Sequence, residues 1–378
     1  MRITFLLPEV SLAGGVRVVA VYSERLMRRG HRVTVVALPR RRPSLRDKLR
    51  SLRHGRGWPA VQKNPPTHFD GTAVDLRVLE CRRPITEADV PDADVIIATW
   101  WETAEWVARL PHRKGAKAYF IQGHEIFPWL PADRVKATYL LPMHKITISR
   151  WLADMMRNEY GDPDVSMVLN GVDLRQFTAP VRDKYAVPTV GMLYAGSHVK
   201  GCDVSLAAVA LARERLPGLR LVAFGAEHPR PDLPLPPGTV YSRQPAQDSI
   251  KAIYSQCDVW LCGSRSEGFH LPLLEAMACR CPVVSTRVGG PMDVIRDGLN
   301  GYLADVEDVA ALADRLVRVL TLPPGEWRTM SDAAYATAQG SDWDAATDLF
   351  EAALITAMDR SRRRGRQVDD FTAAGITG

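Results

Sequence analysis

Two glutamates, Glu267 and Glu275, lie eight positions apart at a predicted junction between a loop and a helix. The run 258–262 before them is short and mostly apolar, which is typical of a buried strand. Pro272 suits the first turn of a helix, where its missing N–H costs no hydrogen bond. Backbone amides at such a helix start point outward and favour an anion. Two carboxylates beside an anion site suit a ligand that carries both phosphates and hydroxyls.

The amides at this helix start belong to Gly268, Phe269, His270 and Leu271. Gly268 has no side chain, so a ligand can approach its backbone closely. Glu275 lies one turn inside the predicted helix, and Glu267 lies on the loop before it. The alternative for such a pair is a solvated Glu267 and an ordinary helix-surface charge at Glu275. The residues around the pair favour the binding site.

The stretch from Glu267 to Ala278, EGFHLPLLEAMA, resembles the signature of the retaining glycosyltransferases of family 4. Pro282-Val-Val284 and the pair Gly289-Gly290 follow it, as they do in that family. His270 is a departure, because the family usually has glycine there. The resemblance implies the GT-B fold, an α/β architecture. In it, two Rossmann-like domains face each other across a cleft and a C-terminal helix crosses back to the N-terminal domain.

The order of predicted elements agrees with two α/β domains. Strand and helix patterns alternate from Arg2 onward, which implies parallel sheets with helices on both faces. The pattern restarts with a predicted strand over 189–195, after a proline-bounded stretch over 180–188. Four parts are predicted: an N-terminal Rossmann-like acceptor domain (1–178), a C-terminal Rossmann-like nucleotide-sugar domain (186–340), a helix crossing back to the N-terminal domain (341–359) and a disordered tail (360–378). The names of the two domains follow from the resemblance.

Further candidate residues follow predicted strands at their carboxyl ends, where open parallel sheets bind ligands. They are Gly14 and Gly15 after the first strand, His124 after the strand at 118–122, and Lys200 after the first strand of the second domain. By the resemblance, the glycines face the donor phosphate, Lys200 grips the diphosphate and His124 reaches the sugar. The alternatives are a plain tight turn, a surface lysine and a loop histidine, and Gln122 equally suits the place of His124.

One residue of the family pattern is missing. The family has an arginine shortly before the position of Lys200, and this chain has Ser197 there. A hydroxyl does not replace a guanidinium that binds a phosphate through two donors. Either another cation, such as Arg265 or Arg150, takes its place, or the alignment is shifted by a residue or two.

No metal and no cofactor are expected. Asp92 and Asp94 imitate a D-x-D metal motif, but they open a predicted strand after a proline and suit capping. No other carboxylate cluster has ligand spacing. The chain shows no lysine motif for pyridoxal phosphate, as GT-B phosphorylases need, and no G-x-G-x-x-G fingerprint of NAD-dependent oxidoreductases. Both classes of enzyme therefore rank low.

The composition is that of a globular protein, with 378 residues of which 46% are hydrophobic and 24% charged. No apolar run approaches the ~18 residues of a membrane span. The apolar run at the N-terminus is too short for a signal peptide and reads as a first strand. Six cysteines without C-x2-C pairs or a histidine at zinc spacing indicate reduced thiols. We therefore expect a cytoplasmic protein.

The net charge of +6 is uneven, because basic residues crowd the segment 40–58. Leu45, Leu49 and Leu52 stand at helical spacing within it, which predicts a basic amphipathic element. Such an element can contact an anionic membrane or an acidic acceptor, and the alternative is a solvated loop. We expect no nucleic-acid partner, because nothing here resembles a nucleic-acid-binding motif.

The resemblance implies a metal-independent, retaining glycosyltransferase that moves a sugar from a nucleoside-diphosphate sugar to an acceptor hydroxyl. Glu267 and His124 are the expected catalytic residues. Glu275 is expected to hold the ribose, while Lys200 and the amides of residues 268–271 stabilise the departing diphosphate. The alternative is a catalytically weak or inactive nucleotide-sugar-binding partner protein. The sequence does not name the base, the sugar or the acceptor.

Overall fold

The structure is a computed structural model that describes residues 1–41, 45–53 and 66–373. The chain divides into two compact units, each built on one sheet. Unit 1 comprises Met1–Ile146, Met156–Ser166 and Thr347–Gly378, and unit 2 comprises Thr147–Met155 and Met167–Ala346.

Unit 1 is built on a seven-stranded sheet with the order β3-β2-β1-β4-β5-β6-β7. Its strands are β1 (Arg2–Leu7), β2 (Arg32–Ala37), β3 (Asp75–Val78), β4 (Val95–Ala98), β5 (Ala116–Ile121), β6 (His144–Thr147) and β7 (Ser166–Met167). The helices in this part of the chain are α1 (Gly14–Arg28), α2 (Leu45–Arg53), η1 (Glu87–Asp89), α3 (Trp101–Arg109), η2 (His112–Lys114), α4 (Ala132–Tyr139) and α5 (Arg150–Asn158). β1 pairs in parallel with β2 and β4, and all three strands are almost fully buried. A parallel sheet covered on both faces requires such continuous apolar strands.

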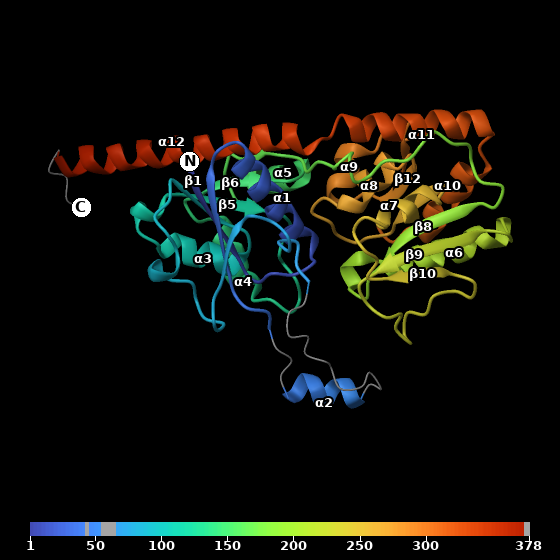
Figure 1. Ribbon diagram of the computed structural model, residues 1–378, viewed down its shortest axis with the longest axis horizontal. Coiled ribbons are helices and arrows are strands. Elements are labelled where there is room, and N and C mark those ends of the chain that lie inside the picture. The colour runs from blue at the N-terminus through green and yellow to red at the C-terminus, as the bar shows by residue number, and fades with distance from the viewer. Residues whose placement is uncertain (42–44, 54–65, 374–378) are drawn as a thin grey trace. The chain divides into compact units, whose positions relative to one another are not determined.

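Unit 2 is built on a six-stranded sheet with the order β10-β9-β8-β11-β12-β13. Its strands are β8 (Thr189–Tyr194), β9 (Arg220–Gly225), β10 (Val240–Arg243), β11 (Val259–Cys262), β12 (Val283–Thr286) and β13 (Gly301–Ala304). Its helices are η3 (His198–Lys200), α6 (Cys202–Arg215), α7 (Ile250–Ser255), α8 (Leu271–Ala278), α9 (Gly289–Val294), α10 (Val309–Thr321) and α11 (Pro324–Gln339). All the strand pairs of this sheet are parallel (Figure 1).

Strand β8 is the point at which the order of unit 2 reverses, because β9 lies on one side of it and β11 on the other. The connections that follow β8 and β11 therefore leave the sheet in opposite directions. Open α/β sheets bind ligands outside the carboxyl ends of the strands at such a point. The two connections that begin there are residues 195–201 and 263–270.

Helix α8 is apolar around most of its circumference. All residues from Leu273 to Ala278 are buried, so the helix needs neighbours on every side. Helices α7 and α11 both contact it. Glu275 is buried with the rest of this helix, and a buried carboxylate needs polar partners.

Residues 147–155 belong to unit 2, although the sequence placed them in the first domain. Two hydrogen bonds explain the difference. The amide of Arg150 donates to Asp293 at 2.8 Å, and Trp151 Nε1 donates to the carbonyl of Glu267 at 3.1 Å. Contacts over more than 100 positions of sequence are not visible in a local pattern.

Helix α12 (Trp343–Ala373) completes the core of unit 1 from the far end of the chain (Figure 1). Its buried side chains recur at helical spacing and include Phe350, Ala353, Leu354 and Ala357. The ring of Phe350 stacks on Tyr22 with the centroids 4.2 Å apart, and it meets Phe120 edge-on at 5.0 Å. The C-terminal helix therefore packs on the N-terminal sheet.

The end of α12 differs from the predicted helix end near residue 359 and the predicted disorder from Arg360. The helix continues to Ala373. Arg360 donates to the carbonyl and the carboxylate of Asp164 and lies 2.9 Å from His144, which anchors the helix beyond its predicted end. The ion pair between Arg362 and Asp359 adds local support. Residues 374–378 lie outside the described residues.

The predicted basic amphipathic element contains helix α2. Leu45, Leu49 and Leu52 are 72%, 62% and 46% exposed, and their spacing places them on one helix face. Residues 42–44 and 54–65, which include parts of the predicted segment 40–58, lie outside the described residues. Among the helices that the structure describes, none has the length and apolar character to cross a membrane.

Replacing Phe350 with alanine is expected to destabilise unit 1. The change removes a buried ring from between Tyr22 and Phe120, and such losses cost about 3–5 kcal/mol. Chemical denaturation measures the free energy of unfolding. Leu349→Ala is the matched control, because this side chain is 57% exposed and its loss should cost less than about 0.5 kcal/mol. Equal effects in the two variants would contradict a core role for α12.

Candidate functional site

Two loops of unit 2 meet at the carboxyl edge of its sheet. The first loop ends in η3, and Gly201 follows with φ of +52°. A Cβ atom on Gly201 would lie 1.9 Å from the carbonyl oxygen of Gly263, at the start of the second loop. Only glycine lets the two backbones approach this closely. The amide of Arg265 donates to the carbonyl of Val199 at 2.9 Å, so the loops are also hydrogen-bonded.

The carboxylate of Glu267 is the centre of a polar cluster formed by these loops. Lys200 Nζ donates to its two oxygens at 2.9 and 2.8 Å. Ser264 Oγ donates to Oε1 at 2.8 Å, and His270 Nδ1 lies 3.2 Å from the same oxygen. The side chains of Glu267 and His270 are 5% and 4% exposed, whereas that of Lys200 is 35% exposed. The carboxylate is buried and has the paired charges and hydrogen bonds that a buried anion requires.

The cluster favours the charged form of each member. Burial raises the pKa of Glu267, but Lys200 and His270 outweigh this effect and hold that pKa well below its usual range. Burial lowers the pKa of His270, but Cys262 and Glu267 raise it to about 10. Burial also lowers the pKa of Lys200, and Glu267 more than compensates, so this pKa is raised. At neutral pH, Glu267 is therefore an anion between two cations.

The same cluster contains a possible set of metal ligands. Cys262, Glu267 and His270 offer a sulfur, an oxygen and a nitrogen within 4.8 Å of one another, and zinc accepts all three kinds of ligand. However, the ammonium of Lys200 already contacts both oxygens of Glu267, and it would repel a second cation there. The contacts favour an ion-pair network over a metal site.

Four backbone amides lie next to this network, those of Gly268, Phe269, His270 and Leu271. Across the residues that the structure describes, none of these amides donates a hydrogen bond to the protein. Helix α8 begins directly after them, so the partial positive charge of its N-terminus adds to theirs. This arrangement can bind an anion such as a phosphate.

The loop that carries these amides rests on the glycine pair at the start of α9. A Cβ atom on Gly289 would lie 2.0 Å from the carbonyl oxygen of Glu267. A Cβ atom on Gly290 would lie 2.3 Å from the carbonyl oxygen of Phe269. The glycine pair therefore has a steric role, because any side chain there would push the loop away.

Glu275 lies in α8 as predicted, and its environment excludes the reading of an ordinary surface charge. The residue is 4% exposed, and the hydroxyl of Tyr254 donates to its Oε2 at 2.7 Å. Tyr254 belongs to α7, which packs on α8. The carboxylate is thus oriented by a neighbouring helix.

Unit 1 places its predicted site residues at the carboxyl edge of its own sheet. Gly14 and Gly15 begin α1, and Gln122 Nε2 donates to the carbonyl of Gly15 at 3.1 Å. His124 is half-buried, its Nε2 lies 2.8 Å from the hydroxyl of Tyr160, and burial lowers its pKa. The structure brings Gln122 and Gly15 together, and the role of His124 stays a prediction.

The two arginines considered as substitutes for the missing cation are both engaged in ion pairs. Arg265 pairs with Asp203 and Glu307 at 2.7 Å each. Arg150 pairs with Asp293 at 3.4 Å. Each guanidinium group is therefore paired with at least one carboxylate.

Arg230 is a cation near Ser197 that the sequence reading missed. Its Nη1 donates to the carbonyl of Gly196 at 2.7 Å, and its other nitrogens contact Asp232. It lies in the loop after β9, more than 30 positions from Ser197, so no local motif includes it. The sequence reading also did not identify Ser264 as a partner of Glu267, although a serine three residues before the glutamate is a signal that could have indicated it.

Asp92 and Asp94 have structural partners. Asp94 accepts hydrogen bonds from the amide and the guanidinium of Arg2 at 2.7 and 2.9 Å. Asp92 pairs with Lys114 at 2.9 Å. Both aspartates precede β4, so they lie at the amino end of that strand and away from the carboxyl edge.

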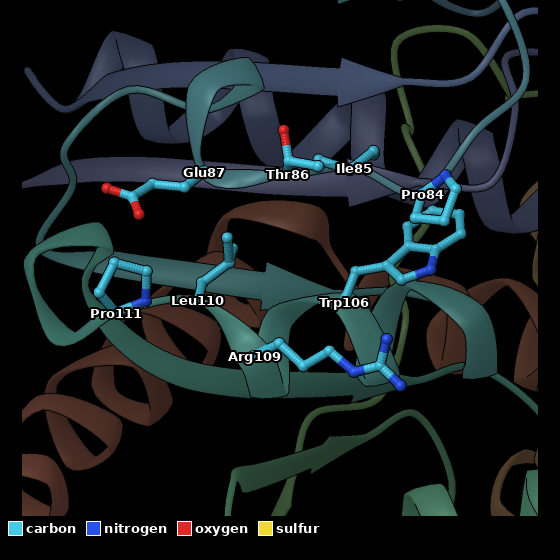
Figure 2. A pocket seen from close by; sticks show the side chains of 8 residues that line it. All are labelled: Pro84, Ile85, Thr86, Glu87, Trp106, Arg109, Leu110 and Pro111. Carbon is cyan, nitrogen blue, oxygen red and sulfur yellow. The ribbon is translucent and has the colours of Figure 1, made fainter.

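A pocket of about 230 Å³ lies in unit 1. Figure 2 shows it between the segment 84–87 and the last turn of α3, with Trp106 and Arg109 among its lining residues. These segments lead into β4 and β5, so the pocket lies at the amino ends of the strands. The candidate residues of unit 1 lie at the carboxyl ends, and the pocket is therefore separate from them.

Two family models match this chain. The model described as Glycosyltransferase Family 4 matches residues 12–176. The model described as Glycosyl transferases group 1 matches residues 185–321, which include the polar cluster of unit 2. The D-inositol 3-phosphate glycosyltransferase of Mycobacterium tuberculosis is 29% identical over 241 residues, which are 56% of this chain and 48% of the relative. The chain thus spans about half the length of the curated relatives it matches.

Solved structures share this fold over nearly the full length of the chain. Sucrose-phosphate synthase from Thermosynechococcus elongatus covers 99% of this chain and 100% of its own, with a TM-score of 0.70 and 18% identity. HepE from Anabaena, in complex with UDP-glucose, covers 94% of this chain and 100% of its own, with a TM-score of 0.67 and 17% identity. At such identities the likeness concerns the fold alone. The two parallel α/β sheets and these neighbours confirm the predicted GT-B fold.

Replacing Gly290 with alanine is expected to displace the loop that carries the amides of residues 268–271. The new methyl group would overlap the carbonyl oxygen of Phe269, and such overpacking costs about 1–3 kcal/mol. Denaturant unfolding measures the cost, and hydrogen exchange of residues 263–271 reports the displaced loop. Gly218→Ala is the control, because a Cβ atom there meets nothing within 4 Å. Indistinguishable stability and exchange in the two variants would contradict the steric role of Gly290.

Proposed function

We propose that this chain transfers a sugar and retains the anomeric configuration of the donor. The two family matches and the GT-B fold support a glycosyltransferase of the family 4 type. The donor is a nucleoside-diphosphate sugar and the acceptor group is a hydroxyl. The observation that carries the proposal is the buried cluster of Lys200, Glu267 and His270 beside the amides of residues 268–271. It combines a fixed anion, two cations and anion-binding amides.

The cations and amides suit the diphosphate of the donor. When the bond between sugar and phosphate breaks, negative charge accumulates on the departing phosphate. Lys200 is partly exposed, so its ammonium can reach a ligand at the surface of unit 2. The amides of residues 268–271 add donors that are fixed before the reaction begins. Preorganised donors of this kind lower the barrier because they need no rearrangement.

The two glutamates suit the hydroxyl-bearing parts of the donor. Glu275, oriented by Tyr254, accepts hydrogen bonds from the ribose hydroxyls. Glu267 supports the positive charge that develops on the sugar ring in the transition state. The acceptor attacks from the face of the leaving group, and the departing phosphate takes its proton, so no strong protein base is required. His124, Gly14 and Gly15 of unit 1 are further proposed contacts with the substrates.

The names of similar proteins suggest the first substrates to test. HepE of Anabaena was solved with UDP-glucose, so UDP-sugars are the first donors. The curated relative is named for D-inositol 3-phosphate, so phosphorylated polyols are the first acceptors.

The competing function is a nucleotide-sugar-binding partner protein without turnover. Ser197 in place of the usual arginine is the observation that favours it. Arg230, which donates to the carbonyl of Gly196, is a cation close to that position and weakens the objection. Release of free nucleoside diphosphate in the presence of an acceptor would exclude a pure binding protein.

The transfer proceeds without a divalent metal in this proposal. Asp92 and Asp94 are bound to Lys114 and Arg2, and Glu267 is bound to Lys200. Cationic side chains thus occupy the carboxylates that a metal would need. Lys200 and the amides supply the positive charge that magnesium supplies at other diphosphate sites.

Helix α2 is the proposed contact with an anionic membrane surface. Three leucines on one face are 46–72% exposed, and Arg46, Lys48 and Arg53 lie on the same helix. A basic helix with an exposed apolar face lies in the interface of an anionic bilayer. The exposed, free Cys81 suits a reducing compartment, so the cytoplasmic leaflet is the proposed side.

Replacing Glu275 with alanine should weaken binding of nucleoside diphosphates by about 10- to 150-fold, because ribose hydroxyls lose a charged partner worth about 1.5–3 kcal/mol.

Replacing Glu267 with glutamine should instead lower kcat far more than donor affinity. Calorimetry with UDP and related nucleotides measures the first effect, and product formation measures the second.

Two further measurements test the proposed reaction: activity in excess chelator, and the anomeric configuration of the product. Wild-type activity should persist in excess chelator, and the product should keep the anomeric configuration of the donor sugar. Unchanged UDP affinity in Glu275→Ala for a donor that the wild type uses would remove the ribose role. Activity that disappears with chelator and returns with manganese would refute metal independence.

Replacing Leu45, Leu49 and Leu52 together with serine should reduce binding to vesicles that contain phosphatidylserine. Cosedimentation at low and high salt measures it, and salt should weaken the wild-type binding because each nearby cation contributes about 1 kcal/mol. Leu140→Ser, at a leucine that is 64% exposed outside α2, is the control. Equal vesicle binding by all three proteins would exclude α2 as the contact. Affinity for nucleotides should stay unchanged throughout.

A further inference from the structure

His270 has an unusual backbone conformation for its environment. Four non-glycine residues in the described part of the chain have positive φ, and His270, at +71°, is the buried one among them. The left-handed conformation is less favourable for a residue with a side chain than for glycine. Such strain persists where the surrounding structure holds it, and it is concentrated at functional sites. The strain therefore suggests that the side chain of His270 has a role that glycine, the usual residue in the family, could not fill.

The ring of His270 has charged and titratable neighbours from three elements. Glu267 on the second loop lies 3.2 Å from Nδ1. The thiol of Cys262, at the end of β11, lies within 4.8 Å. Lys200, from the first loop, completes the group through its contact with Glu267. His270 Nε2 is buried and has no hydrogen-bond partner among the described residues.

Lys200 and His270 differ in what they can reach. The side chain of Lys200 is 35% exposed, and that of His270 is 4% exposed. An arriving diphosphate competes with Glu267 for the ammonium of Lys200. If Lys200 were the one cation at Glu267, the buried carboxylate would then lose its charge partner, and its pKa would rise. His270 cannot leave Glu267 in this way, because it is enclosed.

We propose that His270 is a positioning residue that, as an imidazolium, keeps the Glu267 carboxylate ionised and fixed while Lys200 turns to the diphosphate. This inference rests on the proposed sugar transfer for its purpose, but the charge state of the cluster does not depend on it. The two cations have separate roles: Lys200 binds the diphosphate, and His270 remains paired with the Glu267 carboxylate.

The first experiment measures the charge of His270 directly. NMR of the full chain with labelled histidine, without any ligand, follows the ring signal as pH rises, and His270→Asn identifies that signal. His270 should titrate near pH 10 and not near its ordinary value of 6.5. The pKa of His270 should fall in Cys262→Ala and also in Glu267→Gln, because each change removes a neighbour that raises it. Titration near 6.5 in the unmodified protein would overturn the inference, whatever the protein transfers.

The second experiment separates the charge of His270 from its hydrogen bond. Asparagine tolerates the left-handed conformation and keeps an N–H donor near Glu267, but it carries no charge. His270→Asn should lower kcat about tenfold or more and leave the affinity for nucleoside diphosphate within about twofold. His270→Gly, which also relieves the backbone, should fold normally and lose at least as much. His112→Asn, at an exposed histidine on η2 and outside both loops of the site, is the control and should behave like the unmodified protein.

The pH profile of kcat is the readout that a purely structural role would not move. The unmodified enzyme should lose activity as pH rises through about 10, because the imidazolium loses its proton there. His270→Asn should lack this decline. Full kcat in His270→Asn, or the same alkaline decline in both proteins, would overturn the positioning role. If the unmodified protein transfers no sugar at all, the proposed function fails, and the NMR titration still decides the charge of His270.

Discussion

Burial of the Glu267 carboxylate is the constraint on which the candidate site of unit 2 depends. A carboxylate that is 5% exposed remains an anion only if opposite charges and hydrogen-bond donors surround it. Those partners come from different places in the chain: Lys200 from the loop after β8, Ser264 from the loop after β11, and His270 from the start of α8. The carboxylate therefore ties the two loops together at the point where the strand order of the sheet reverses.

Residues without side chains make this arrangement possible. Gly201 and Gly263 allow the two loops to approach more closely than any Cβ atom would permit, and Gly289 and Gly290 do the same for the start of α9. The polar cluster and the four amides beside it thus depend on close backbone contacts between residues that have no functional side chains. This dependence gives the glycines near the signature a physical reason that is independent of any ligand.

The two units also show how distant segments complete a core. Helix α12 leaves unit 2 at residue 346 and supplies Phe350 to the aromatic cluster of unit 1. Residues 147–155 do the reverse, because Trp151 donates to the carbonyl of Glu267 in unit 2. Each unit is therefore assembled from segments that are separate in the sequence, and neither is a single continuous stretch of chain.

The sequence by itself determined the alternation of strands and helices and the positions of Glu267 and Glu275 around a helix start, whereas the GT-B fold was implied by the resemblance to family 4. Periodicity, proline and glycine act over a few residues, so a linear pattern contains them. Only the tertiary structure decided that Glu275 is buried against Tyr254, that Arg265 is held by surface carboxylates, and that α12 continues beyond Arg360. It also decided that Lys200, 67 positions before Glu267, is the partner of that carboxylate. Such pairings depend on where loops converge in space, and local sequence does not encode that convergence.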